Sequence, residues 1–251
     1  MTNLLLDQIY PLQADCNTMA CDGQLLYTFH RSDSTIFRLE AQGETACASP
    51  TRPRYQSVCY DDKDGCFWAV PAGPSNRMIR LNQAWEETGT LAITCSSTPI
   101  NHIFYVRATD SLLLGTCSML YRMSKQGDIL TTYRAPSDAL IMAAGDLGGD
   151  TLLVSNSLFT SPDVIRVLSS GTSQTENITC LPDGHRCYSL CAAAGTNGTS
   201  FLYLLTKKNG RSYVLKYRFY LPAVIQPSDC ADGYLSEQEY RQMVCIQELT
   251  I

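Results

Sequence analysis

A short apolar–basic–apolar motif recurs along this chain and constrains its fold more than any other feature. The first copy reads Ile36-Phe37-Arg38-Leu39, and the basic residues of the later copies are Arg80, Arg122, Arg166 and Lys216. These five basic residues are separated by 42, 42, 44 and 50 residues. A period of about 40 to 50 residues with strand-like patterns is what the blades of a β-propeller produce. The repeat therefore predicts an all-β propeller.

Turn residues divide each repeat into four short strands. In the first repeat we expect strands at residues 17–21, 25–30 and 35–40, with a fourth strand after Gly43. Asp22-Gly23 marks the first turn, as Asp-Gly pairs do between strands. Many of these strands are apolar at successive positions, which indicates sheets that are covered on both faces.

Residues 5–12 precede the first repeat and have no repeat of their own. We expect them to supply the outer strand of the last repeat by pairing with the strand near residues 213–220. This pairing would join the two ends of the ring and cover an edge that is costly to leave unpaired.

The last 31 residues break the pattern. A capping-box sequence, Ser236-Glu237-Gln238-Glu239, predicts a helix over residues 237–247. An alternative alignment matches Asp232-Gly233 and the sequence up to Leu249 to the first repeat, which would make a sixth blade. We predict a single propeller of five blades, each of four antiparallel strands, over residues 1–220. Residues 221–251 then form a linker and a helix packed on it, or the remnant of a sixth blade.

Composition excludes several classes of function. The formal net charge is −5, and the basic residues of the motif are spread one to a repeat, which argues against a nucleic-acid surface. The longest uncharged apolar stretch, residues 139–145, is too short to cross a membrane. The first residues lack the basic region and cleavage site of a signal peptide. We therefore expect a soluble, cytoplasmic protein that binds neither nucleic acid nor membrane.

The twelve cysteines fit a reducing compartment. Cys21, Cys59 and Cys191 each stand near the end of a first strand, where a free cysteine packs as a small hydrophobic side chain. Structural zinc sites need four ligands in paired spacings, and Cys187-x-x-x-Cys191 stands alone. We therefore predict neither a metal nor a cofactor.

The progression Asp-Gly, Leu-Tyr, Ile-x-Arg-Leu, Gly-Glu resembles the repeats of β-propeller proteins in general, over about residues 1–220. Repeat-end Trp-Asp pairs and the Kelch double glycine are missing. Propellers include lectins, scaffolds, glycosidases and metal-dependent lactonases, so the resemblance implies a fold and leaves the function open.

The turns between repeats and the turns between second and third strands lie on one face of a propeller, which we call the upper face. Such turns carry binding residues on a rigid scaffold. The residues that we propose as ligand-binding there are His30, Asn101, His102, Asp138 and His185. Other polar residues of these turns are Asp15, Asp33, Asp183 and Lys207.

Other interpretations of these residues are open. His30, His102 and His185 would form a metal site or a general base if they converged. Asp15, Asp138 and Asp183 would offer the carboxylate pair of a glycosidase, although loop aspartates usually form turns. Residues 228–239 resemble an EF-hand calcium loop but depart from it at Ser228 and Cys230.

The repeated basic residues are interpreted as structural, through ion pairs or as caps of the grooves between blades. Our leading interpretation of function is a non-catalytic propeller, a scaffold that binds a protein or small ligand on the upper face. The alternative is a hydrolase or lyase, similar to a glycosidase or lactonase, that uses carboxylates and histidines there.

Overall fold

The computed structural model describes eleven stretches of the 251-residue chain: residues 4–33, 35–40, 43–47, 54–73, 76–94, 99–134, 140–146, 151–156, 163–168, 175–194 and 199–220. The chain divides into two compact units, Met1–Leu221 and Pro222–Ile251. The second unit lies outside the described residues, and with it the expected helix at residues 237–247, the alternative sixth blade and the loop at residues 228–239.

The described strands of the first unit form five four-stranded antiparallel sheets. In four sheets the strands follow chain order. The first sheet contains β2 (Cys16–Cys21), β3 (Leu26–His30), β4 (Ile36–Glu40) and β5 (Gly43–Ala46). The second contains β6 (Tyr55–Asp61), β7 (Cys66–Pro71), β8 (Arg77–Leu81) and β9 (Glu87–Ala92). The third contains β10 (His102–Val106), β11 (Ser111–Gly115), β12 (Met119–Ser124) and β13 (Ile129–Arg134). The fourth contains β14 (Leu140–Asp146), β15 (Thr151–Asn156), β16 (Val164–Leu168) and β17 (Thr175–Cys180).

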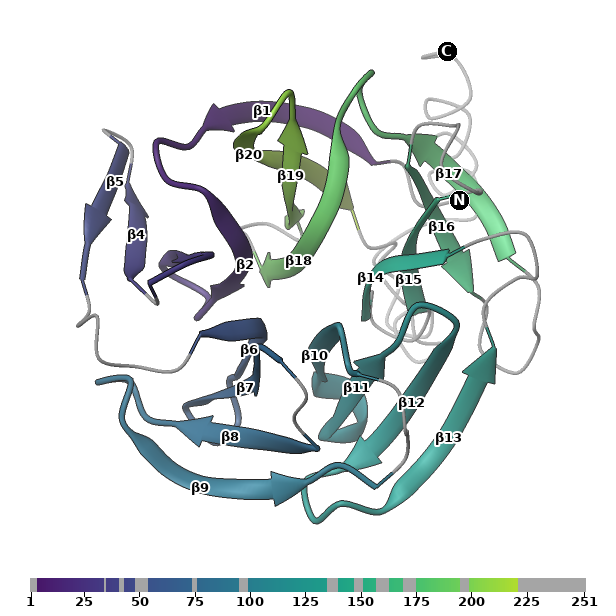
Figure 1. The fold of residues 1–251 in the computed structure, drawn as a ribbon. Coiled ribbons are helices and arrows are strands. Elements are labelled where there is room, and N and C mark those ends of the chain that lie inside the picture. Colours follow the sequence, from purple (N-terminus) through teal and green to yellow (C-terminus); the bar gives the residue numbers. More distant parts are fainter. Residues whose placement is uncertain are drawn as a thin grey trace, which may run out of the picture. The chain divides into compact units, whose positions relative to one another are not determined.

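The closing sheet combines the two ends of the repeat region. Its order is β18 (Arg186–Ala194), β19 (Thr199–Lys208), β20 (Arg211–Tyr220) and β1 (Leu5–Pro11). The first strands of the five sheets contact one another in the order β2, β6, β10, β14, β18 and back to β2, so they form a closed ring (Figure 1). The prediction of an all-β propeller is confirmed. Among the described residues, no helix is long and apolar enough to span a membrane.

The predicted pairing of the N-terminal strand is confirmed as well. β1 runs antiparallel to β20, with Ile9 opposite Leu215 and Pro11 opposite Tyr213. Just after β1, the Leu12 amide donates a hydrogen bond to the Ser212 carbonyl over 2.9 Å. Because β20 would otherwise end the sheet with an unpaired edge, β1 removes an exposed edge and closes the ring without a covalent bond.

The repeated basic residues all lie on third strands, each facing the second strand of its sheet. Lys216 lies 3.4 Å from Asp7 of β1, and its ammonium lies over the Phe201 ring. Arg80 lies 3.2 Å from Asp64 and over the Trp68 ring. Arg38 pairs with Glu40 of its own strand. The contacts of Lys216 and Arg80 support the structural interpretation of the motif, because each anchors a third strand to a neighbouring strand or turn.

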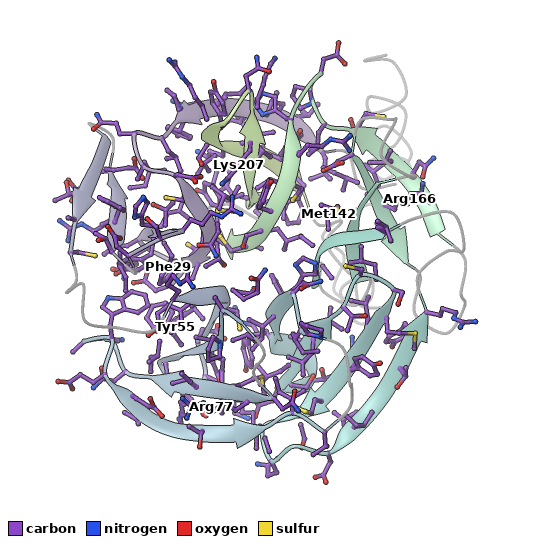
Figure 2. The ribbon with its side chains drawn as sticks, in the orientation of Figure 1. Phe29, Tyr55, Arg77, Met142, Arg166 and Lys207 are labelled. Atoms are coloured by element: carbon purple, nitrogen blue, oxygen red, sulfur yellow. The ribbon has the colours of Figure 1, made fainter. Side chains whose placement is uncertain are left out.

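Aromatic side chains fill the space between the first two sheets. The rings of Phe29 and Tyr55 meet edge to face at 5.9 Å (Figure 2). Trp85, in the turn before β9, stacks on Phe67 at 4.2 Å and also contacts Phe29. Trp85 has a φ of 65°, which a side chain of this size rarely adopts. The buried ring compensates for that strain, since aromatic side chains bury large areas.

Removal of residues 1–12 should strongly lower the melting temperature or the solubility. This deletion removes β1 and Leu12, so it exposes the edge of β20 and part of the core. Thermal unfolding followed by circular dichroism, with soluble yield as a second readout, measures the effect. Leu5→Ser is the matched control, because Leu5 lies on β1 but is 60% exposed. A deletion variant that melts with the full-length protein would contradict the role of β1.

The described cysteines differ in burial. Burial raises the pKa of the thiols of Cys59, Cys187 and Cys191 well above the ordinary value, and it raises the pKa of half-buried Cys21 to about 11. A buried thiol with a raised pKa is a poor nucleophile.

Alkylation at neutral pH should therefore discriminate among the cysteines. Exposed Cys47, Cys117 and Cys180 should react first, whereas Cys59 and Cys191 should resist until the protein unfolds. Peptide mapping by mass spectrometry after a timed pulse of iodoacetamide, with and without denaturant, is the measurement. Rapid modification of Cys59 or Cys191 in the folded protein, or a disulfide at either, would contradict the assignment.

Candidate functional site

The strand register places the proposed upper-face residues at equivalent ends of their sheets. His30 ends β3 opposite Cys16, the first residue of β2. His102 begins β10, directly after Asn101, and His185 directly precedes β18. Asp138 lies outside the described residues. Four of the five proposed residues therefore share one end of the propeller.

His30 and His185 make hydrogen bonds within their own sheets. His30 Nδ1 lies 2.6 Å from a carboxylate oxygen of Asp33. His185 is buried, with Nδ1 2.9 Å from the Thr206 hydroxyl and its ring edge-on to Tyr213. Burial lowers the pKa of His185. Within the described part of the chain, no group of potential metal ligands joins two of the three histidines.

His102 bridges two sheets instead of facing solvent. It is only 9% exposed, and its Nε2 lies 3.3 Å from the Ile141 carbonyl of β14 in the next sheet. Because a carbonyl only accepts, Nε2 carries the proton. Burial lowers the pKa of His102 to about 4. The side chain of His102 is therefore buried between two sheets, and it does not project from a turn into solvent.

Hydroxyl side chains make the corresponding bridges elsewhere in the ring. Each accepts a hydrogen bond from a backbone N–H of the first strand in the next sheet. The donors and acceptors are Met19 to Ser189 (3.3 Å), Val58 to Thr18 (3.2 Å) and Ile103 to Ser57 (3.0 Å).

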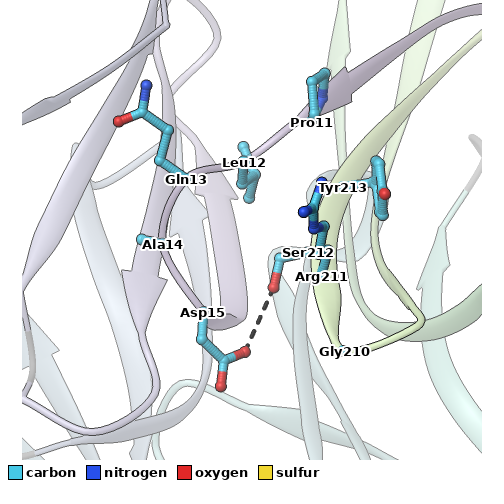
Figure 3. A pocket seen from close by; sticks show the side chains of 9 residues that line it. All are labelled: Pro11, Leu12, Gln13, Ala14, Asp15, Gly210, Arg211, Ser212 and Tyr213. Carbon is cyan, nitrogen blue, oxygen red and sulfur yellow. Dashed lines mark hydrogen bonds between the residues drawn. The ribbon is translucent and has the colours of Figure 1, made fainter.

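A pocket of about 410 Å³ lies at the junction of the closing sheet and the first sheet. Residues 11–15, which connect β1 to β2, line one side, and residues 210–213, at the turn into β20, line the other (Figure 3). Both segments belong to upper-face turns. We call this cavity the seam pocket, because it lies where the two ends of the repeat region meet.

Polar groups gather at one end of the seam pocket. The Ser212 hydroxyl, which is buried, donates to a carboxylate oxygen of Asp15 over 3.4 Å and accepts from the Cys16 amide over 3.2 Å (Figure 3). Lys207 forms an ion pair with the same Asp15 oxygen and lies over the Tyr188 ring. Partial burial alone would raise the pKa of Asp15, but the Lys207 ammonium lowers it below the usual value. Asp15 is therefore ionised at neutral pH.

The other end of the seam pocket is lined by apolar groups and one cation. Leu12 and Pro11 stand on one wall, and Tyr213 stands on the other. The side chain of Arg211 lies beside Tyr213 and faces Leu12 across the cavity (Figure 3). Arg211 is exposed and makes no ion pair with any residue that the structure describes.

A second charged cluster lies on the opposite face, in the turns after β6 and β10. Asp61, Asp64 and Cys66 are close enough to hold a metal ion. However, the Lys125 ammonium lies 2.7 Å from Asp61 and 3.3 Å from Asp64, and Arg80 contacts both Asp64 and Cys66. Cations of the chain itself therefore neutralise these ligands. We interpret the cluster as a bridge between the second and third sheets.

The sequence predicts part of the seam pocket. Asp15, which lines the pocket, is among the polar residues of the predicted upper-face turns. Lys207 and His185 belong to the same turns and contact the lining residues Asp15 and Tyr213. The sequence analysis places Tyr213 at the start of a structural strand and assigns Arg211 and Ser212 to no site, so it does not predict these three residues of the pocket. The Asn209-Gly210 pair could have indicated them, because it predicts a tight hairpin that places the residues directly after it on the upper face.

The fold defines the chain as a β-propeller protein. Searches against protein-family models and against curated proteins found no match. Among solved structures, the chain is similar to the glutaminyl cyclase of Myxococcus xanthus, with a TM-score of 0.62 and 8% identity over 88% of this chain and 98% of that one. It is also similar to the virginiamycin B lyase of Staphylococcus aureus, with a TM-score of 0.50 and 11% identity over 88% of this chain and 100% of that one. Identities this low show a shared fold alone.

Buried His102 should make stability depend on pH. Its pKa is about 6.5 when unfolded and about 4 when folded, so the unfolded chain binds more protons between these values. The contribution of neutral His102 is complete above pH 6.5 and is lost as the pH falls toward 4. Between pH 7 and pH 5 the loss should be about 2 kcal/mol.

Denaturant unfolding of the wild type and of His102→Gln at pH 7 and pH 5 measures how much of the loss of stability comes from His102. Glutamine keeps an N–H donor for the Ile141 carbonyl but does not titrate, so the variant should lose less stability on acidification. Equal losses in the two proteins would show that His102 is not buried in its neutral form.

Proposed function

We propose that this chain is a five-bladed propeller that binds a small-molecule ligand in the seam pocket of its upper face and leaves the ligand chemically unchanged. The observation that carries the proposal is the pocket itself. Its volume of about 410 Å³ is within the range of small-molecule sites, which are roughly 300–1,000 Å³. Its lining combines apolar side chains with a few polar groups, as such sites do.

The state of the titratable groups favours binding over chemistry. Asp15 is held ionised by Lys207, which suits a hydrogen-bond acceptor better than a general acid. His30 and His185 already bind Asp33 and Thr206, and His102 bridges two sheets. An enzyme would need such groups to converge on one reacting atom.

The alternative function is a hydrolase or lyase that acts in the same pocket. Two observations favour it. The similar solved structures include a glutaminyl cyclase and a lyase, both enzymes. The pocket also places a buried serine hydroxyl against a carboxylate. Turnover of a bound ligand, followed by mass spectrometry, distinguishes this function from simple binding.

A pocket-blocking variant tests the proposal. A fragment library screened by ligand-detected NMR should yield compounds that bind the wild type and raise its melting temperature. Ala14→Trp should abolish their binding, because Ala14 lines the pocket and an indole would fill it. Thr131→Trp on exposed β13 is the matched control for the added ring and should bind as the wild type does.

The screen has two outcomes that would contradict the proposal. Compounds that bind Ala14→Trp as well as the wild type would place the site elsewhere. Compounds that are converted to products would favour the alternative. A cytoplasmic location and the absence of nucleic-acid and membrane partners stay predictions.

A further inference from the structure

We infer that the ligand of the seam pocket carries an anionic group, a carboxylate or a phosphate, that pairs with Arg211. This inference rests on the proposed function and adds the chemical class of the ligand. It depends on the charges around the pocket, the rigidity of the turn that carries Arg211, and the apolar wall beside it.

Among the described residues, the carboxylates that contact the pocket lining are already bound, whereas Arg211 of the lining is paired with none of them. Asp15 is bound by Lys207 and Ser212. Glu44 accepts the backbone N–H groups of Gln13 and Ala14 at 2.7 and 3.2 Å. Asp15 and Glu44 are therefore already bound within the chain.

Arg211 has no such partner among the described residues. Arg31 adds a second positive charge near Asp15, where it helps to lower the pKa of that carboxyl group. The formal charge of the chain as a whole is −5, so this local excess of cations differs in sign from the rest of the protein. An excess of one sign in a cleft attracts ligands of the other sign.

A rigid turn holds Arg211 at the rim. Asn209 and Gly210 have φ values of 50° and 76°, the left-handed conformations of a two-residue hairpin turn. Arg211 pairs with Lys208 directly across this turn, at the first position of β20. The backbone of Arg211 is thus fixed before any ligand binds, which reduces the entropy lost on binding.

The surroundings of Arg211 favour a particular kind of anion. Its guanidinium offers a planar fork of N–H donors that matches a carboxylate or a phosphate in a bidentate pair. Tyr213 and Leu12 stand on either side of the opening. A flat apolar group attached to the anion would lie between them, so aromatic carboxylates and aromatic phosphates represent the class.

Three probes of similar size test the inference by isothermal titration calorimetry or by NMR. Benzoate and phenyl phosphate are anionic, whereas benzamide is the neutral counterpart of benzoate. We expect at least one anionic probe to bind about tenfold or more tightly than benzamide, since hydrogen bonds between charged groups are stronger than those between neutral groups. Whichever anion binds more tightly identifies carboxylate or phosphate as the favoured group.

Variants of Arg211 then test whether this residue causes the tighter binding of the anionic probe. Arg211→Gln should reduce the affinity for the anionic probe to that for benzamide, and Arg211→Lys should retain part of it because the charge remains without the fork. Arg134→Gln, at an exposed arginine of β13, removes the same charge away from the pocket and should leave binding unchanged. Rising salt should weaken the anionic probes only.

The outcomes separate this inference from the proposed function. If benzamide binds as tightly as the anions, or if Arg211→Gln changes nothing while Ala14→Trp abolishes binding, the pocket is correct and the anionic class is wrong. If no probe or fragment is sensitive to Ala14→Trp, both are wrong.

Discussion

The structure depends on how the first strands of the five sheets find hydrogen-bond partners for the backbone groups on their unpaired edges. Each of β2, β6, β10, β14 and β18 pairs with a second strand on one side only. Its other edge has no strand partner in its sheet, and a buried N–H without a hydrogen-bond partner there would cost about 1–3 kcal/mol. For β2, β6 and β10 a hydroxyl of the preceding sheet supplies the acceptor, whereas at β14 the direction reverses and His102 donates to the Ile141 carbonyl. Neighbouring sheets are therefore joined by directional bonds as well as by apolar contact. These bonds fix the register of the ring, because each acceptor reaches one N–H of its neighbour.

The bridging residues occupy one position of the repeat, and this explains His102. Thr18, Ser57 and Ser189 lie opposite Phe29, Val70 and Leu205, each two residues beyond the residue that faces the basic anchor of its repeat. His102 lies opposite Gly115 at the same position. Glycine leaves room for the imidazole there, because a Cβ on Gly115 would lie 3.1 Å from the ring, a tighter contact than most Cβ atoms make. In the third sheet His102 therefore takes the structural position that a hydroxyl takes in three other sheets, but it donates a hydrogen bond to the next sheet instead of accepting one.

The sequence contained enough to predict the strands but not the pocket. Periodicity predicted the third strands from Arg38 to Lys216, and the unpaired segment at residues 5–12 predicted closure by β1. Burial of His102 and the cluster around Lys125 depend on side chains from different sheets, which one repeat does not reveal. The seam pocket is harder still, because it joins residues 11–15 to residues 210–213 and exists only once β1 has paired with β20. Each side of the pocket, taken alone, resembles an ordinary turn.

Because the pocket forms only when β1 pairs with β20, ligand binding there would affect the stability of the closed ring. The ring is closed by β1 through hydrogen bonds and packing, and Leu12 and Asp15, which follow β1, contact Ser212 next to the cavity. A ligand held between Leu12 and Arg211 would touch both ends of the repeat region at once. Such a ligand binds the closed ring and has no site in an opened one, so its binding free energy adds to the stability of the closure. Under the proposed function, occupation of the pocket would be coupled to integrity of the ring, because the same residues form both.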